Sequence, residues 1–409
     1  MRAHNRLALA SFVILGVAFA PGAFWTGAAA AAVPRPASAR SLAPGTSASE
    51  AIPAGDLSLV YGTDLSSPGH LIEGDTATQA ALRDKLNRST YSTVPFWASS
   101  FDSGGTTYPF FMVGNSPSHP GTTVVPTVLI PIDLTFQDNL SSLSPQLDGS
   151  VNVPAILHSP IFQAATFAVT GGTTQYADAM TRAEWWNVLK NVPSHHVLLG
   201  APAVLPTVQL TVPTGAGFLE DPGDGIPHGL ISSTSWWADQ ITSLLSTLNI
   251  SPEVLPIFVT YDMAAGLDSG FHGALGVPQP NGKLAISTYA WASWMDPGWF
   301  AFVGLGQEVG ADVDVLSHEV NEWVNDPFLT NVVPDWSFSV PPIIFDACSN
   351  LLETGDPLEL VNFPVTLGGF TYHLQDAAFF SWFARQSPSA GYQGLYTYLG
   401  TFTSYSTPC

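Results

Sequence analysis

Hydrophobic residues recur along this chain with two spacings, and each spacing predicts one type of secondary structure. Short apolar runs, and apolar residues at every second position, indicate β-strands. Apolar residues three and four positions apart indicate an amphipathic helix. On this basis we expect strands at residues 122–136, interrupted by a proline, and at 207–212, 255–261 and 284–289, and helices at 174–190, 233–248 and about 375–385.

A further helix is predicted just before the proline at position 327. Asp312 or Asp314 can cap its N-terminus, and Pro327 prevents it from continuing beyond about Asp326. The large apolar residues of this segment share one helical face, so we expect that face to pack on the core. They are Leu316, Val320, Trp323 and Val324.

The order of these elements predicts an α/β (α+β) fold, in which a mixed sheet packs on the helix before Pro327. We expect a β-rich N-terminal part at residues 56–230, loop-rich up to about residue 120, and a second part at residues 231–409 that carries this helix. One continuous domain at residues 56–409 is the alternative.

The N-terminal residues combine the features of a secretory signal peptide. A basic start at residues 1–6 precedes an apolar run to about residue 24 and small residues at 28–32. We expect cleavage near residue 32, followed by an Ala/Pro/Ser-rich linker at residues 33–55. The mature protein is therefore expected to be secreted or extracellular, including the periplasm and the cell wall. An uncleaved membrane anchor is the alternative, because the apolar run approaches spanning length.

The charge of the chain excludes some classes of partner. The sequence has 11 Lys and Arg against 32 Asp and Glu, which gives a formal net charge of −21. A surface so poor in cations cannot neutralise phosphates, so we expect neither nucleic acid nor, after signal cleavage, a membrane as partner.

Two cysteines, Cys348 and Cys409, are present. In an oxidising compartment the simplest expectation is one disulfide that ties the C-terminus to the body of the protein. Two free thiols are the alternative, and a four-cysteine zinc cluster is excluded.

The predicted helix before Pro327 carries the most informative motif. His318 and Glu322 are four positions apart and therefore lie on one helical face, where both can reach the same ion at the floor of a cleft. Glu319 directly follows the histidine. The pattern is close to the H-E-x-x-H metalloprotease signature, in which two histidines hold zinc and the glutamate activates water. Here Glu322 replaces the second histidine. A surface helix with solvated charges is the alternative.

A catalytic zinc site needs a third protein ligand and one open position. Glu353 follows Glu322 by 31 residues and is the first candidate for that ligand. Asp346, next to Cys348, is the competing candidate. Asp356 can instead accept a hydrogen bond from His318 and orient its ring.

Two further histidines, His272 and His373, can complete such a site. Each can act as a fourth ligand or donate a hydrogen bond to an oxyanion. The alternative for each is a loop histidine whose hydrogen bonds are satisfied locally.

The segment 317–328 resembles the H-E-L-x-E-x-x-T-[ND]-P motif of secreted zincin-like proteins related to the plant Exordium, or phosphate-induced, family. Those proteins also carry a downstream E-x-G-D or D-x-C segment, similar to residues 353–356 and 346–348 here, and an upstream G-[YF]-H-[GS] loop, similar to residues 270–273. The resemblance covers about residues 255–356. It implies secretion and a zincin-like metalloprotease fold.

Three functional hypotheses follow. The first is a secreted metal-dependent peptidase-like hydrolase that acts on an extracellular protein or peptide, with one divalent ion, expected to be zinc, on His318, Glu322 and Glu353, and with Glu319 as the general base. The second is a non-hydrolytic zincin-fold factor, extracellular or associated with the cell wall. The third is a glycan-binding surface protein that uses the tryptophan pairs at 185–186 and 236–237.

The disulfide hypothesis can be tested directly. We expect the Cα atoms of Cys348 and Cys409 to lie about 4.4–6.8 Å apart, within reach of a bridge. Thiol titration of the unreduced, denatured protein should then find no thiol, and reduction should release both. Two thiols without reduction would exclude the bridge.

Overall fold

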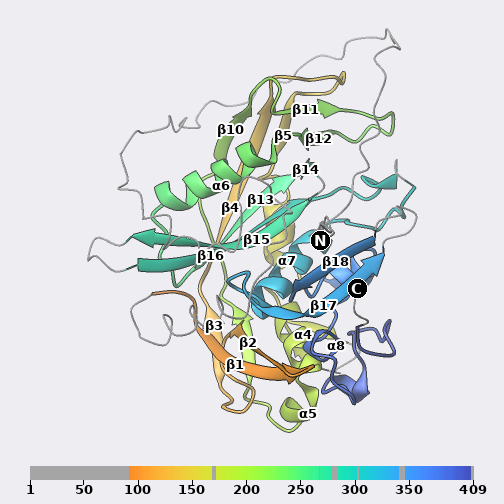
Figure 1. Cartoon of the computed structure of the whole chain (residues 1–409). Helices are drawn as coiled ribbons and strands as arrows, with labels where there is room; N and C mark the ends of the chain where they lie inside the picture. The colour runs from red at the N-terminus through yellow and green to blue at the C-terminus, as the bar shows by residue number, and fades with distance from the viewer. Residues whose placement is uncertain are drawn as a thin grey trace, which may run out of the picture.

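The computed structural model describes residues 92–167, 172–266, 268–278, 284–301, 304–339 and 346–406. The predicted signal peptide and linker, and Cys409 of the predicted disulfide, lie outside these residues. The described chain has a mixed α/β architecture in which strands predominate (Figure 1). No helix within these ranges is long and apolar enough to cross a membrane.

The largest sheet is mixed and has the strand order β10-β4-β13-β16-β15, with β5 and β9 also paired to β4. Its central strand, β13, pairs in parallel with both neighbours, whereas β15 is antiparallel to β16. The strands are β4 (Thr127–Phe136), β5 (Gln146–Asp148), β9 (Ala203–Val204), β10 (Val208–Val212), β13 (Leu255–Tyr261), β15 (Gly270–Pro278) and β16 (Leu284–Trp294). The sheet thus joins strands from both sides of residue 230.

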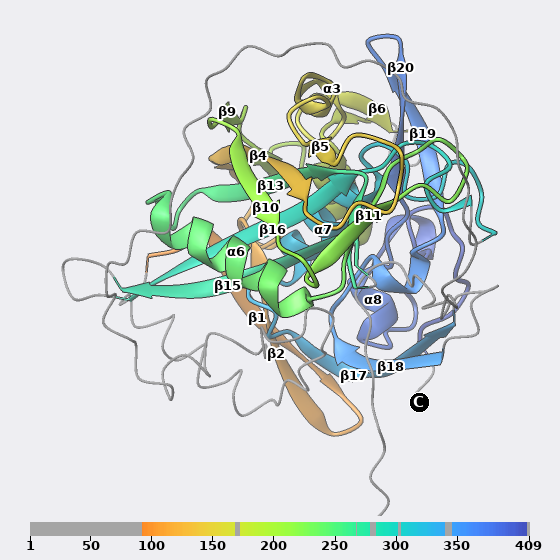
Figure 2. The same cartoon turned by 90° about the horizontal axis from the view of Figure 1, so that it is seen from above.

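Both faces of this sheet are covered. Successive residues of β13 point to opposite faces, and Ile257 and Phe258 accordingly belong to different hydrophobic clusters. Helix α6 (Thr234–Thr247) packs in the cluster of Phe258 through Trp237, and it lies across the strands in Figure 2. Helix α7 (Asp314–Asn325) and helix α4 (Tyr176–Glu184) pack in the cluster of Ile257. Because β13 is buried on both faces, its sequence is an almost unbroken apolar run.

Smaller elements surround α7. Three hairpins are formed by β1 (Phe96–Ser103) with β2 (Thr106–Val113), β17 (Val332–Ser339) with β18 (Asp346–Leu351), and β19 (Asn362–Leu367) with β20 (Phe370–Gln375). The remaining elements are β3 (Thr122–Val125), α3 (Val153–His158), β6 (Ala165–Phe167), β7 (Gly172–Thr174), α5 (Trp186–Leu189), β8 (His196–Leu199), β11 (Gly217–Glu220), β12 (His228–Ile231), β14 (Met263–Ala265), η2 (Asp356–Leu358), α8 (Phe380–Phe383) and η3 (Tyr392–Gly394).

The predicted strands are confirmed as β3 with β4, β10, β13 and β16, and the break in the first falls at Pro126. The helix predicted at 233–248 is confirmed as α6. The helix predicted at 174–190 is divided at Trp185, where the backbone leaves helical geometry (φ −97°, ψ 27°), into α4 and α5.

Two predictions were wrong. Residues 270–273, expected in a glycine-rich loop, begin strand β15, in which His272 lies opposite Ala290 of β16. Residues 375–385, expected to be one helix, contain the end of β20 and only the short α8. Asp376 accepts hydrogen bonds from the N–H groups of Ala377 and Leu399, so this backbone is held in a non-helical arrangement.

Helix α7 is confirmed where it was predicted, and it ends directly before Pro327. Its N-cap is Val313, so the expected capping by Asp312 or Asp314 was wrong. Asp314 instead accepts a hydrogen bond from the N–H of Gly310 (2.8 Å). All 12 residues of α7 are buried, not only its apolar stripe. The polar side chains of the helix therefore face other elements and not solvent.

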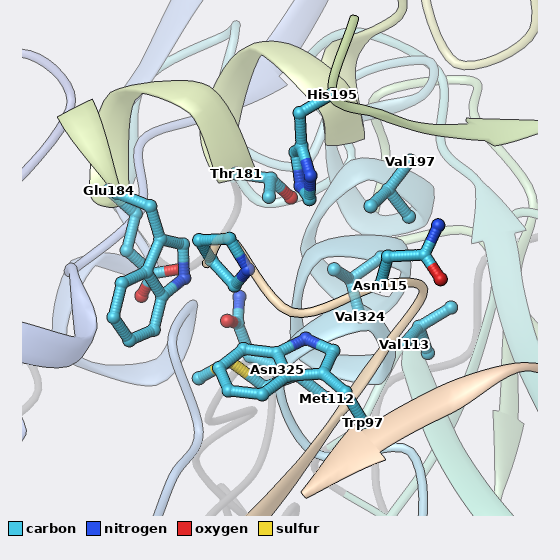
Figure 3. A pocket seen from close by; sticks show the side chains of 12 residues that line it. Trp97, Met112, Val113, Asn115, Thr181, Glu184, His195, Val197, Val324 and Asn325 are labelled. Atoms are coloured by element: carbon cyan, nitrogen blue, oxygen red, sulfur yellow. The ribbon is translucent and has the colours of Figure 1, made fainter. Parts of the chain in front are cut away.

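The stability of this fold should depend on pH through Glu184. This residue ends α4, accepts a hydrogen bond from the Phe380 N–H, and borders a small cavity between α4, β2 and the C-terminal end of α7 (Figure 3). Burial raises the pKa of its carboxyl group from the ordinary 4.5 to about 8. The folded protein therefore holds this proton more tightly than the unfolded chain does. Its stabilising effect is complete below about pH 4.5 and is lost as the pH rises to about 8.

We expect the melting temperature to fall as the pH rises from about 5 to about 8. Glu184→Gln should reduce the accompanying loss of unfolding free energy by on the order of 1–3 kcal/mol. Glu253→Gln, at an exposed carboxyl group, is the matched control and should not change the profile. Thermal unfolding followed by circular dichroism across this pH range measures both. An unchanged pH dependence in Glu184→Gln would contradict the assignment.

Candidate metal centre

Helix α7 supplies three polar side chains to one buried position. The Nε2 atom of His318 lies 3.1 Å from Oε2 of Glu322 and 4.0 Å from Oε1 of Glu319. The first pair is four residues apart and shares a helical face, as the motif predicts. None of the three residues is more than 1% exposed.

The ring of His318 is oriented by Gln375, at the end of β20. The amide nitrogen of Gln375 donates a hydrogen bond to the carbonyl oxygen of Gly355 (2.8 Å), which leaves its Oε1 atom to face Nδ1 of His318 (2.8 Å). An oxygen can only accept, so Nδ1 carries the proton and Nε2 faces the carboxylates. Histidines that bind metals are commonly oriented in this way. Gln375, and not Asp356 as considered above, fills this role.

The loop after β18 fixes the position of Glu322. The N–H groups of Gly355 and Asp356 lie 3.0 and 3.3 Å from Oε1 of Glu322 and donate to it, so Oε2 is the oxygen that faces the imidazoles. Gly355 also has to be a glycine, because a Cβ atom there would lie 2.5 Å from Nδ1 of His318. The same loop carries Glu353, which is 3% exposed.

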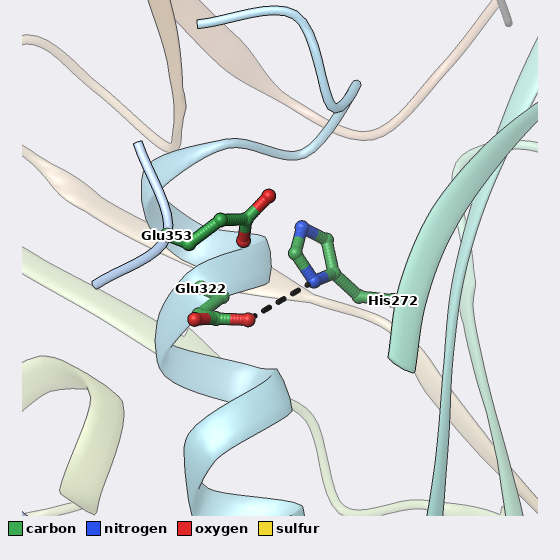
Figure 4. Close-up of side chains that lie close together, drawn as sticks. All are labelled: His272, Glu322 and Glu353. Atoms are coloured by element: carbon green, nitrogen blue, oxygen red, sulfur yellow. Dashed lines mark ion pairs between the residues drawn. The ribbon is translucent and has the colours of Figure 1, made fainter. Parts of the chain in front are cut away.

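Strand β15 brings His272 to the same place. Its Nδ1 atom lies 3.5 Å from both Glu319 Oε2 and Glu322 Oε2. Its Nε2 atom donates to the carbonyl oxygen of Asp326 (3.2 Å), so this imidazole also presents an unprotonated nitrogen when it is neutral. Figure 4 shows the ring of His272 facing the carboxyl groups of Glu322 and Glu353.

These residues form two groups that could hold a metal ion. One group is His318, Glu319 and Glu322, and the other is His272, Glu322 and Glu353. Within each group the potential ligand atoms lie within 4.8 Å of one another. Asp356 lies next to the first group, with Oδ1 3.6 Å from Nε2 of His318.

The electrostatics of the site favour a cation. Burial alone would lower the pKa of His318, but the charges of Glu322 and Glu319 outweigh burial and raise it to about 10. Burial and the charge of Glu322 raise the pKa values of Glu353 and Asp356 well above their ordinary range. Crowded carboxyl groups of this kind keep protons that a divalent cation can replace.

Buried atoms without hydrogen bonds also indicate that these residues suit a metal ion. Oε2 of Glu353 and both carboxyl oxygens of Asp356 are buried and have no hydrogen-bond partner in the part of the chain that the structure describes. Such atoms are costly in the interior unless they are paired or coordinate a metal. Imidazole nitrogens together with carboxylate oxygens are ligands that zinc and related divalent ions accept.

The structure places the other predicted residues as follows. His373 lies outside both groups and pairs with Asp312, Nδ1 to Oδ2 at 2.7 Å, at the start of α7. The side chain of Asp346 lies outside the described part. The expected cleft was wrong, because His272 is the most exposed of the site residues at only 5%.

Three residues of the site were missed in the sequence. Gln375 gave no signal, because a neutral amide is not a typical ligand and its strand resembled a helix. Glu359 could have been found, since Glu353, Asp356 and Glu359 recur at every third position. Asp268 is 2% exposed, and the charges of Glu319 and Glu359 add to burial in raising the pKa of its carboxyl group.

The tryptophan pairs considered for glycan binding contribute to packing. Trp237 is fully buried and contacts Trp291 edge-on, with ring centroids 5.2 Å apart. Trp185 stacks on Phe380 at 5.4 Å. Trp237 is therefore part of the core, and the half-buried Trp185 packs against the core.

Comparison of the chain with protein-family models, with curated proteins and with solved structures finds no match. The zincin-like fold and the likeness to Exordium-related proteins therefore stay predictions from the sequence.

The role of Gln375 can be tested by metal affinity. Gln375→Ala removes the acceptor that orients His318, and we expect about 10- to 100-fold weaker metal binding. Gln163→Ala, which also loses a side-chain hydrogen bond to a carbonyl group but at an exposed position, is the control. Competition with a chromophoric chelator measures the affinity of both variants. Unchanged affinity in Gln375→Ala would show that His318 does not depend on this contact.

Proposed function

We propose that this chain is a secreted, metal-dependent, peptidase-like hydrolase with a zincin-like fold. The observation that carries the proposal is the convergence of His318, Glu319 and Glu322 on one side of α7, with Glu353 brought to Glu322 by the loop after β18. This is the combination that the H-E-x-x-E motif and the downstream glutamate predict. The substrate class that fits the motif is an extracellular protein or peptide.

His318 and Glu322 would hold the ion, with zinc as the expected metal and a buried carboxylate as the third ligand. Glu353, the third ligand expected from the sequence, groups with Glu322 and His272 and not with His318, whereas Oδ1 of Asp356 lies 3.6 Å from Nε2 of His318. When bound, a divalent ion supplies Lewis acidity, which polarises a carbonyl oxygen and makes water more acidic. Two carboxylates among three ligands reduce the positive charge at the site compared with a two-histidine site. The ligand set therefore accepts harder metals more readily.

Glu319 would transfer protons in this proposal, as the general base. Its carboxyl oxygens lie 4.0 Å from Nε2 of His318 and 3.5 Å from Nδ1 of His272, so it borders the ligand atoms of both groups. Burial raises the pKa of its carboxyl group above 4.5 and so toward neutral pH, where a general base works best. Gly270 makes room for it, because a Cβ atom there would lie 2.7 Å from Oε1 of Glu319.

A non-hydrolytic extracellular factor with the same fold is the second candidate. It is favoured by the burial of the site, since His318, Glu319 and Glu322 are each at most 1% exposed. Structural metal sites are closed, whereas catalytic sites keep one position open for water or substrate.

Two variants separate these candidates. Glu319→Gln should keep the metal but lower peptide hydrolysis by about 10²- to 10⁴-fold, because the amide keeps the shape of the side chain and cannot take a proton. His318→Ala should lose hydrolysis together with the ion that His318 holds. Glu308→Gln, at an exposed carboxyl group, is the matched control and should retain both.

Elemental analysis and cleavage of a peptide library measure the two properties. Full activity in Glu319→Gln would exclude Glu319 as the base. Metal binding without cleavage by the wild-type protein would favour the non-hydrolytic factor.

A further inference from the structure

We propose that this centre holds two divalent ions, with Glu322 as the ligand shared between them. The inference rests on the proposed metal-dependent function and extends it, because the sequence alone predicts one ion. In this arrangement His318 and Asp356 belong to the first ion site, and His272 and Glu353 belong to the second.

The ligand atoms divide into two sets around one carboxylate. Oε2 of Glu322 lies 3.1 Å from Nε2 of His318 and 3.5 Å from Nδ1 of His272. The two imidazoles nevertheless fall into different groups of candidate ligands, and Glu322 is the member common to both groups. A single ion with bonds of about 2.0–2.2 Å has ligand atoms no more than about 4.4 Å apart. Two ions that share Glu322 can each take one of the two imidazoles as a ligand.

Each proposed ion site contains a buried carboxyl oxygen that has no hydrogen-bond partner among the described residues. On the side of His272 this is Oε2 of Glu353, and on the side of His318 it is Oδ1 of Asp356, 3.6 Å from the ring nitrogen. Glu353 is 3% and Asp356 1% exposed, so solvent does not satisfy these atoms. In Figure 4 the carboxyl group of Glu353 is turned toward the ring of His272.

A hydrogen bond from one ring nitrogen orients each of the two histidines as a potential metal ligand. His318 donates through Nδ1 to the Gln375 side chain, and His272 donates through Nε2 to the carbonyl oxygen of Asp326. Each ring therefore directs its second nitrogen toward the shared Glu322. Outer hydrogen bonds of this kind fix the tautomer of metal-binding histidines.

Once their protons are displaced, the carboxyl groups of the cluster carry more negative charge than one ion can balance. Four carboxyl groups belong to the candidate ligands, and two more are buried beside them. One divalent ion balances two negative charges, and two ions balance four. The six residues are Asp268, Glu319, Glu322, Glu353, Asp356 and Glu359, each at most 3% exposed.

Two ions sharing a carboxylate place the centre among two-metal hydrolases. In such enzymes, aminopeptidases and phosphatases among them, the two ions together activate the attacking water and stabilise the negative charge that develops on the substrate. The expected substrate class is therefore one that offers a polar ligand atom to each site, such as a peptide with its carbonyl oxygen and free N-terminal amine, or another hydrolysable acyl or phosphoryl compound.

Metal stoichiometry tests the inference. The purified mature protein is stripped with a chelator, reloaded with zinc and in parallel with manganese, and analysed for metal per chain. We expect two equivalents in the wild-type protein and one in His272→Ala and in Glu353→Gln. His119→Ala, at an exposed histidine, is the control and should keep two.

The outcomes separate this inference from the proposed function. One equivalent in the wild-type protein overturns the second ion and leaves the hydrolase proposal standing. No bound metal overturns both. Two equivalents that persist in His272→Ala and in Glu353→Gln would place the second ion elsewhere and overturn the inference.

A spectroscopic measurement on the wild-type protein does not depend on the folding of variants. Cobalt(II) is added to the metal-free protein in steps, and the electron paramagnetic resonance signal is recorded. Two ions bridged by Glu322 should couple magnetically, so the signal per cobalt should fall as the second equivalent binds. A signal that grows in proportion to cobalt through two equivalents would exclude the shared ligand.

Discussion

The complete burial of α7 is the constraint on which the rest of the structure depends. A helix with polar side chains can be buried only if its neighbours satisfy them, because unpaired polar groups are costly in the interior. Different neighbouring elements of α7 each supply a hydrogen-bond partner for one of these side chains. Asn321 donates to the hydroxyl group of Thr354, and the indole of Trp323 donates to Thr288 of β16. The positions of β16, β20 and the loop after β18 are therefore tied to the side chains of one helix.

The sequence predicted the central strands and the two long helices well, because their patterns agree with their environments. Strand β13 is buried on both faces and has the almost unbroken apolar run that such burial requires. Strand β15 was not predicted, because its glycines are poor strand formers. They are present for tertiary reasons: a Cβ atom at Gly273 would lie 2.7 Å from the ring of Tyr289 on β16. That requirement comes from a neighbouring strand and is invisible in the local pattern.

The candidate site likewise contains residues that local sequence spacing predicts and residues that it does not. His318, Glu319 and Glu322 could be grouped from the sequence, because helical periodicity fixes their relative positions. The partners of these residues come from other elements and depend on long-range packing. His272 reaches the site because β15 pairs with β16 and passes α7, and Gln375 does so because β20 ends beside the same helix. Local spacing could not place either residue there.

The separation of the site residues along the sequence also affects how the chain folds. His272 lies 50 residues before Glu322, and Glu353 lies 31 residues after it, so the centre closes two long loops of chain. Contacts that close such loops cost conformational entropy and form after local structure. The centre is therefore complete only when strand pairing and helix docking are complete. A cation bound there would link three separate segments, as a covalent cross-link does, and would bind only a chain that has already reached its topology.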